Sequence, residues 1–388
     1  MKHLRFFPAL CMCGIMGIAF ASTQSSPSPG AQESTVVLSY KEVVFTPLEI
    51  EFEISSESVQ FTKMPEKSLL EPVTGLFPVG SDEEEYIPFA WFKLQQRLYF
   101  DLNRNYDLSD DPGGMFTGER DGFNQRFSNI KLEIARDESS LPYLIDLSMN
   151  DSSNIPTCTV SMHSLFHTQI PIAGKMWDFA VCDNLDGEIN ISLNTANSDC
   201  LVLRPVDPEG KPFGSCTTAH MDILNCPASL YLNNCAFALS YGFDTASDPV
   251  SLNIKVRPYL CETGTIQLSG DPVGFLILEG DHTIIIDRPA EEVRVPAGEY
   301  PAQRLAIQKD HEAKSSWCSA SERLKVLKDN RELFKVDLKE LSQRSPTYAS
   351  KKYKVIVKSS GIVFGDGVKS SNSTVTKRRV RAARTSSG

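Results

Sequence analysis

The sequence predicts an all-β protein of two or three sandwich-like modules, built from mostly antiparallel strands with few short helices. Short runs rich in Ile, Leu and Val recur at intervals of about 8 to 12 residues, and Gly, Asp and Asn separate them. No segment sustains the 3.6-residue period of an amphipathic helix between capping residues. A hydrophobic content of 41% is typical of a folded chain rather than a disordered one.

The N-terminal strands carry the clearest pattern. In "LEIEFEI" (48–54), Leu, Ile, Phe and Ile alternate with three glutamates, which predicts a half-buried strand with an acidic outer face. "FSNIKLEIARD" (127–137) and "PYLIDLSMND" (142–151) are expected to form a strand pair. These runs favour a β domain in the first part of the chain.

The later segments also consist of strand patterns separated by turn signals. Two strands are expected to join near Ala173 and Gly174, and Asn233-Asn234 lies between two alternating runs, which is a hairpin signal. In "VPAGEY" (295–300), Pro and Gly occupy turn positions. Asp329-Asn330 favours another hairpin, with a helix as the alternative for the flanking run.

The chain divides by composition into six segments. We expect a signal peptide over 1–21, a linker over 22–36, an N-terminal β domain with an Asp/Asn loop over 37–152, a cysteine-rich β domain over 153–260, a C-terminal β-sandwich region over 261–370 and a disordered basic tail over 371–388.

The first residues predict export. Lys2 and Arg5 precede an apolar run that ends in small residues at Ala19 and Ala21, as in a secretory signal. The alternatives are an uncleaved signal that anchors the chain in a membrane, and a lipoprotein attached through a cysteine of the run. Export would place the mature protein in the periplasm, at the cell surface or outside the cell.

Cysteine usage agrees with an oxidising compartment. The even number of cysteines beyond the signal makes disulfides the default expectation, and eight cysteines allow 105 pairings. No C-x-x-C motif is present to indicate a redox site or a zinc ribbon. The disulfide candidates are Cys158, Cys182, Cys200, Cys216, Cys226, Cys235, Cys261 and Cys318.

Charge is unevenly distributed. From residue 309 onward there are 19 Lys and Arg against 8 Asp and Glu, whereas the preceding residues have 20 against 41. The two parts could attract each other, or the basic end could contact an anionic surface. Nucleic-acid binding would rest on the tail alone, so we do not expect it.

An Asp/Asn-rich loop follows a predicted strand. In "DLNRNYDLSDD" (101–111), oxygen-bearing side chains occupy every second position, as in the first half of an EF-hand-type calcium loop. Tyr106 stands where such a loop has Gly, and Pro112 stands where it has a bidentate Glu. The alternative is a turn held by its own Asx hydrogen bonds. The candidate calcium ligands are Asp101, Asn103, Asn105, Asp107, Asp110 and Asp111.

A second, weaker loop is "CDNLDGEIN" (182–190). Its candidate ligands are Asp183, Asn184, Asp186 and Asn190, and Gly187 suits the turn. His163 and His167 are four residues apart but lack the glutamate of an H-E-x-x-H motif, so surface histidines are the simpler expectation.

These loops carry a resemblance. "LYFDLNRNYDLSDD" resembles the D-L-N-x-[ND]-x-D-L-[ST]-D-D loop of a group of uncharacterised, exported, β-rich bacterial proteins, and "WDFAVCDNLDGEINI" resembles a second Asp/Asn/Gly loop in such chains. "VPAGEYPAQRLAI" is similar to the V-P-x-G-x-Y segment of carboxypeptidase-regulatory-like modules. The resemblance implies a β-rich exported architecture and no particular substrate or catalytic residue.

Nucleophile and nucleotide motifs are missing. The sequence contains no G-x-S-x-G, no P-loop and no G-x-G-x-x-G. We therefore expect an exported, non-enzymatic binding or interaction protein with structural calcium loops, and a polysaccharide or protein ligand at the cell surface. The alternative is a secreted hydrolase of extracellular polysaccharide, whose carboxylates the sequence does not identify.

Overall fold

The computed structural model describes residues 33–54, 59–65, 70–80, 85–111, 113–136, 139–152, 155–172, 174–191, 199–206, 223–270, 273–307, 316–320, 324–328, 331–336, 355–358 and 377–378. The fold is all-β, as predicted, and no helix occurs in these residues, so the expected short helices are not seen there. Accordingly, no described helix could cross a membrane. The predicted signal peptide, most of the linker and most of the basic tail lie outside the described residues.

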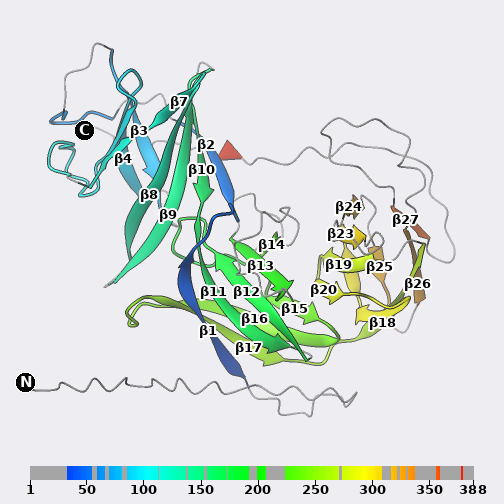
Figure 1. The fold of residues 1–388 in the computed structure, drawn as a ribbon. Helices are drawn as coiled ribbons and strands as arrows, with labels where there is room; N and C mark the ends of the chain where they lie inside the picture. The colour runs from blue at the N-terminus through cyan, green and yellow to red at the C-terminus, as the bar shows by residue number, and fades with distance from the viewer. Residues whose placement is uncertain are drawn as a thin grey trace, which may run out of the picture.

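A twelve-stranded sheet forms the largest element (Figure 1). Neighbouring strands are antiparallel except β15 and β20, which are parallel. In spatial order its strands are β14 (Ile223–Asn225), β13 (Cys200–Pro205), β12 (Lys175–Cys182), β11 (Ser164–Ile172), β1 (Ser34–Glu42), β17 (Ser251–Pro258), β16 (Cys235–Asp244), β15 (Ser229–Leu232), β20 (Thr283–Asp287), β19 (Val273–Glu279), β23 (Ala302–Ile307) and β24 (Ser316–Ala320).

A six-stranded sheet stands beside the large one in Figure 1. Its order is β28 (Lys377–Arg378), β2 (Glu49–Glu53), β10 (Thr157–Met162), β9 (Ser139–Asn150), β8 (Asn124–Arg136) and β7 (Glu119–Asp121). The sheet runs across the domain boundary predicted at residue 153, because β10 pairs with β9 along its whole length.

Three smaller sheets complete the fold. One is β3 (Val73–Pro78), β4 (Tyr86–Phe92), β5 (Arg97–Phe100) and β6 (Met115–Thr117). Another is β21 (Glu292–Pro296), β18 (Thr263–Gly270), β26 (Arg331–Val336) and β27 (Val355–Lys358). The third is the pair β22 (Gly298–Tyr300) and β25 (Leu324–Val326).

Local sequence explains several elements. Phe52 and Ile54 are buried while Glu49 is exposed, which confirms the alternation predicted over 48–54. Asn233 and Asn234 have φ values of 46° and 71°, so both take the left-handed conformation of a type I′ turn and join β15 to β16 as predicted.

The hairpin predicted at Asp329-Asn330 is wrong. The strand before it, β25, pairs with β22, and the strand after it, β26, pairs with β18 and β27. The two turn residues themselves lie outside the described residues. Pairing with distant strands has overridden the local turn signal.

The core has three main parts. The first lies between the six-stranded sheet, the β3–β6 sheet and one face of β11–β13. The second joins strands from both ends of the large sheet: Trp177 of β12 and Phe275 of β19 contact with ring centroids 6.5 Å apart, so this sheet curls on itself. The third packs β15, β16, β19 and β20 against the C-terminal strands.

Candidate metal centre

Two neighbouring strands of the large sheet position a group of acidic side chains. β12 ends at Cys182 and β13 begins at Cys200, and the antiparallel register places these two residues opposite each other. Asp183 follows the first strand and Asp199 precedes the second. The register therefore brings two carboxylates that are distant in sequence to the same end of the strand pair.

Three buried carboxylates converge at this point. Asp183, Asp186 and Asp199 each offer an oxygen, and these oxygens lie within 4.8 Å of one another. The exposed fractions of the three residues are 2%, 8% and 0%. Within the described part of the chain, this is the one group of at least three such side chains close enough to hold a metal ion.

Asp183 has one satisfied and one unsatisfied oxygen. Its Oδ1 accepts hydrogen bonds from the backbone N–H of Leu185 at 2.7 Å, from that of Gly187 at 3.3 Å and from the Tyr143 hydroxyl at 3.1 Å. Its Oδ2 is buried without a hydrogen-bond partner. Burying an acceptor in this way is costly unless a positive ligand fills the position.

The other two carboxylates organise the loop. Asp199 Oδ1 accepts the backbone N–H of Asn184 at 2.8 Å, and its Oδ2 accepts that of Asn190. Asp186 Oδ1 accepts the backbone N–H of Glu188 at 2.9 Å, and its Oδ2 accepts the Asn190 amide. The loop is thus wound around the carboxylates, in the manner of a cation-binding turn.

The electrostatics of the group are unfavourable in isolation. Burial, and then the charge of Asp186, raise the pKa of Asp183 to about 7. Burial, and then the charges of Asp183 and Asp186, raise the pKa of Asp199 to about 9. No basic side chain of the described residues contributes to either shift. The three carboxylates therefore need either protons or an added cation.

Backbone conformation is unusual at the same place. Leu185 has a φ of 77° although its side chain is buried, and Gly187 has a φ of 71°. A left-handed leucine is strained and persists only where its surroundings fix it. Here the Leu185 carbonyl accepts the backbone N–H of Gly80 at 2.7 Å, next to the end of β3, and Tyr143 reaches in from β9. The loop therefore ties three sheets together.

The donor set is made of oxygen atoms. Carboxylates from three aspartates, with the amide oxygen of Asn184 in the same loop, suit a hard divalent cation such as Ca²⁺. Calcium takes six to eight such ligands and tolerates irregular geometry, whereas magnesium requires a near-ideal octahedron. Calcium is therefore the better fit to a mixed carboxylate and amide loop.

The first Asp/Asn loop lies between β5 and β6. Asp101 is fully buried, and its carboxylate caps the loop: Oδ1 accepts the backbone N–H of Asn105 at 3.1 Å and Oδ2 accepts that of Tyr106 at 2.8 Å. Both oxygens of the first predicted ligand are thus taken up by backbone donors.

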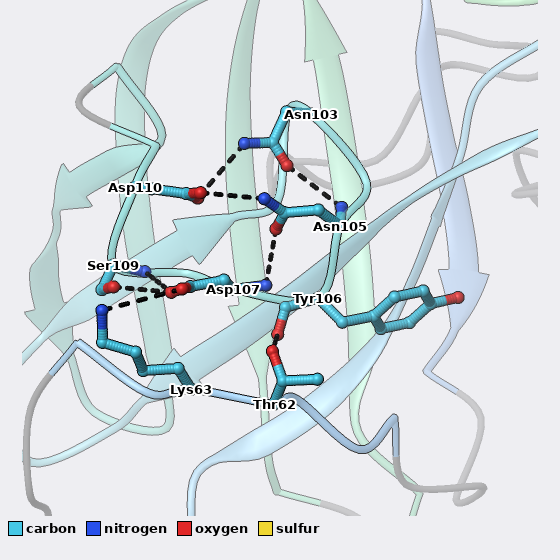
Figure 2. A network of polar contacts seen from close by, with 8 residues as sticks. All are labelled: Thr62, Lys63, Asn103, Asn105, Tyr106, Asp107, Ser109 and Asp110. Carbon is cyan, nitrogen blue, oxygen red and sulfur yellow. Dashed lines mark hydrogen bonds and ion pairs between the residues drawn. The ribbon is translucent and has the colours of Figure 1, made fainter.

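Successive Asx hydrogen bonds run along this loop (Figure 2). Asn103 Oδ1 accepts the backbone N–H of Asn105 at 3.0 Å, and Asn105 Oδ1 accepts that of Asp107 at 2.7 Å. Asp107 Oδ1 accepts the Ser109 N–H at 2.9 Å and its hydroxyl at 2.6 Å. This is the self-stabilised turn that the sequence offered as the alternative to calcium.

The remaining acidic residues close the same loop. The amides of Asn103 and Asn105 donate to the two oxygens of Asp110 at 3.2 and 2.8 Å. Asp111 Oδ1 accepts the Asn103 backbone N–H at 3.2 Å, and its Oδ2 is buried without a partner. Burial raises the pKa of Asp111, and the charges of Asp101 and Asp110 raise it further.

A second segment covers the loop. Thr62 donates to the Tyr106 carbonyl through both its backbone N–H and its hydroxyl, each at 2.8 Å, and the Lys63 ammonium lies 3.7 Å from Asp107 (Figure 2). Tyr106 has a φ of 61°, so it takes the left-handed conformation for which calcium loops use glycine. An opposing lysine and internal hydrogen bonds make this loop the weaker candidate for a cation.

The structure therefore brings together the four residues predicted for the second loop and adds Asp199, which sequence reasoning missed. A signal for it was present: the motif Cys-Asp at 182–183 is mirrored by Asp-Cys at 199–200. If the two flanking runs are paired as antiparallel strands, the aspartates become neighbours.

The predicted cysteines and histidines are placed as follows. The structure joins no two of the six cysteines at 158, 182, 200, 226, 235 and 261 by a disulfide, and the side chains of those at 216 and 318 lie outside the described residues. His167 Nε2 lies 2.9 Å from Asp178 Oδ1, whereas His163 Nε2 lies 3.6 Å from Asp146 Oδ2. The two histidines thus face different carboxylates.

Comparison with known proteins gives no relative. No protein-family model, no curated protein and no solved structure matches this chain. The residues and their geometry are therefore the basis for a functional proposal.

Proposed function

We propose that this chain is an exported, non-enzymatic binding or interaction protein whose β scaffold is held together by a calcium ion at Asp183, Asp186 and Asp199. The observation that carries the proposal is the buried Oδ2 of Asp183, which has no partner and belongs to a group of three carboxylates. A divalent cation would satisfy this oxygen and neutralise the repulsion in one step.

The position of the group supports a structural role for the cation. The loop that carries Asp183 and Asp186 contacts the end of β3 and the β9 residue Tyr143, and its Leu185 side chain belongs to the core shared by three sheets. A cation there would fix the relative position of elements that are far apart in sequence. Loss of the cation should therefore lower the free energy of unfolding of the whole chain.

A groove over β7, β8 and β9 is smaller than a typical small-molecule pocket. Its volume is about 210 Å³, and it is lined by Asp121, Asn124, Arg126, Asp146, Leu147 and Ser148. Pockets for small molecules usually enclose about 300 to 1,000 Å³. Arg126 lies 3.3 Å from Asp146, whose carboxylate also accepts from Ser128 and Asn129, so this carboxylate serves the β8–β9 bulge.

The signal peptide predicted over 1–21 supports export. We propose the periplasm, the cell surface or the extracellular space as the location, and a polysaccharide or a protein as the ligand. Exposed strand edges and loop clusters would make the contact.

The cation is tested by isothermal titration of the full mature chain after it has been stripped with a chelator. We expect one calcium ion per chain with a clear preference over magnesium, and no binding by Asp183→Asn. Asp110→Asn, in the first loop, is the matched control and should bind like the wild type. Absence of calcium binding by the wild type would refute the cation proposal.

The binding role is tested on a glycan array with the calcium-loaded chain. Binding to a defined polysaccharide without release of shortened products supports a non-enzymatic receptor. Release of reducing ends from the bound glycan would favour the hydrolase alternative instead.

A further inference from the structure

The cysteines that bracket the carboxylate group are paired by the sheet itself. Cys182 is the last residue of β12, Cys200 is the first residue of β13, and they are direct register partners. Directly opposite residues in antiparallel strands have Cα atoms about 4.5 or 5.5 Å apart. A disulfide spans Cα separations of about 4.4 to 6.8 Å, so the backbone here already has the spacing that the bond requires.

Both side chains point into the same core. Cys182 and Cys200 have exposed fractions of 0% and 3%, and they lie in the same cluster as their strand neighbours Ala180 and Val202. The Cys182 thiol donates to the Ser164 carbonyl at 3.4 Å, and the Cys200 thiol donates to the Pro47 carbonyl at 3.6 Å. Both side chains lie buried in one cluster beside the strand pair, so a change of side-chain rotamer would bring the two sulfur atoms together without moving the strands.

The other described cysteines lack such a partner in the strand register. Cys226 belongs to the core on the opposite side of the large sheet, and Cys158 has Phe52 and Met149 as its strand partners. Cys235 lies opposite Leu232 in the β15–β16 hairpin. Of the register pairs in the described strands, the pair of 182 with 200 is the one that consists of two cysteines.

We infer that Cys182 and Cys200 form a disulfide that links the end of β12 to the start of β13 beside the carboxylate group. The bond forms when one thiolate attacks a disulfide oxidant such as oxidised glutathione, which releases one glutathione thiol. The second cysteine then displaces the other glutathione, so that two thiols are oxidised, one external disulfide is reduced and two protons pass to the glutathione thiolates.

The bond would also support the cation, and this part of the inference rests on the proposed function. Asp183 and Asp199 are the immediate neighbours of the two cysteines, so a covalent link would hold two ligand-bearing segments at a fixed separation. Removal of an outer support of a metal site typically costs 10- to 100-fold in affinity, and we expect a loss on the order of tenfold here.

The bond is tested by peptide mapping of the full chain, refolded with a mixture of reduced and oxidised glutathione and alkylated without prior reduction. Cleavage after lysine and glutamate isolates Cys182 in the peptide 176–188 and Cys200 in the peptide 189–209. We expect these peptides to be joined until a reductant is added. Recovery of both as separate alkylated peptides, or of either joined to a different peptide, would overturn the inference.

The link to the cation is tested separately by calcium titration. The variant with both Cys182→Ser and Cys200→Ser should bind calcium about tenfold more weakly than the wild type, whereas Cys235→Ser, outside the pair, should bind normally. Equal affinities would show that the disulfide does not support the cation. Joined peptides in a chain that binds no calcium would leave the disulfide standing and remove the proposed cation.

Discussion

Asp183 and Asp199 lie on opposite sides of one strand junction, sixteen positions apart in sequence, with their carboxylate oxygens within 4.8 Å. Neither forms an ion pair with a basic side chain among the described residues. Burial and then the charge of Asp186 raise the pKa of Asp183, and burial and then the charges of Asp183 and Asp186 raise the pKa of Asp199. Two buried like charges in such proximity are stable only with a proton or a cation between them.

Asp183→Asn should stabilise the calcium-free protein and abolish its response to calcium. The amide keeps an oxygen for the backbone donors of Leu185 and Gly187 and removes one negative charge from the group. At pH 8 we expect an increase in the free energy of unfolding on the order of 1 to 3 kcal/mol, measured by urea denaturation in chelator. A less stable variant in chelator would argue that the three carboxylates do not repel one another.

The calcium-free protein should lose stability as the pH rises. Asp183 and Asp199 have folded pKa values of about 7 and about 9, above the value of about 3.9 in an unfolded chain. The folded state therefore binds more protons than the unfolded state between these limits, so stability falls from about pH 4 to about pH 9. The melting temperature, measured in chelator, should therefore fall as the pH is raised across this range.

The control for this pH dependence is the variant with Asp183→Asn and Asp199→Asn, which cannot titrate at these positions. Its melting temperature should change less steeply over the same range. A slope equal to that of the wild type would assign the effect to other groups.

Gln125→Leu should destabilise the N-terminal core. Trp91 Nε1 donates to Gln125 Oε1 at 2.6 Å, and Gln125 Nε2 donates to the Lys93 carbonyl at 2.5 Å, with both side chains buried. Leucine would leave the indole N–H and the carbonyl without partners, at a cost of about 1 to 3 kcal/mol in the free energy of unfolding. In a double-mutant cycle with Trp91→Phe, the combined loss should be smaller than the sum of the single losses. Additive losses would contradict the hydrogen bond.

Arg104→Gly should stabilise the first loop. Arg104 is exposed and has a φ of 59°, a conformation that costs a non-glycine residue about 1 kcal/mol. We expect a gain of about 0.5 to 1 kcal/mol in thermal or urea unfolding. Arg120→Gly in β7, where no positive φ occurs, is the matched control and should be destabilising. If both variants are less stable than the wild type, Arg104 does not have the left-handed conformation described here.

Sequence patterns predicted the fold where local preferences agreed with the final pairing. The alternation over 48–54 and the turn at Asn233-Asn234 are local signals, and both are confirmed. The Asp329-Asn330 hairpin is wrong because β25 and β26 each pair with strands elsewhere in the chain. Long-range pairing of this kind leaves no periodic trace in a short segment.

The candidate site also depends on long-range strand pairing that a local sequence pattern does not reveal. Asp183, Asn184, Asp186 and Asn190 form one local loop and could be proposed from spacing alone. Asp199 joins them only through the register of β12 with β13, which the sequence does not specify. The first loop had the better motif, yet both oxygens of its Asp101 accept backbone N–H groups and its amide side chains bond to Asp110, details that composition does not reveal.

The central claim is that a divalent cation holds this scaffold together at Asp183, Asp186 and Asp199. The most direct measurement is the melting temperature of the full mature chain with excess calcium and with chelator, for the wild type, Asp199→Asn and the first-loop variant Asp110→Asn. We predict that calcium raises the melting temperature of the wild type and of Asp110→Asn by several degrees, and that it leaves Asp199→Asn unchanged. A wild-type melting temperature that is the same in calcium and in chelator would contradict the claim.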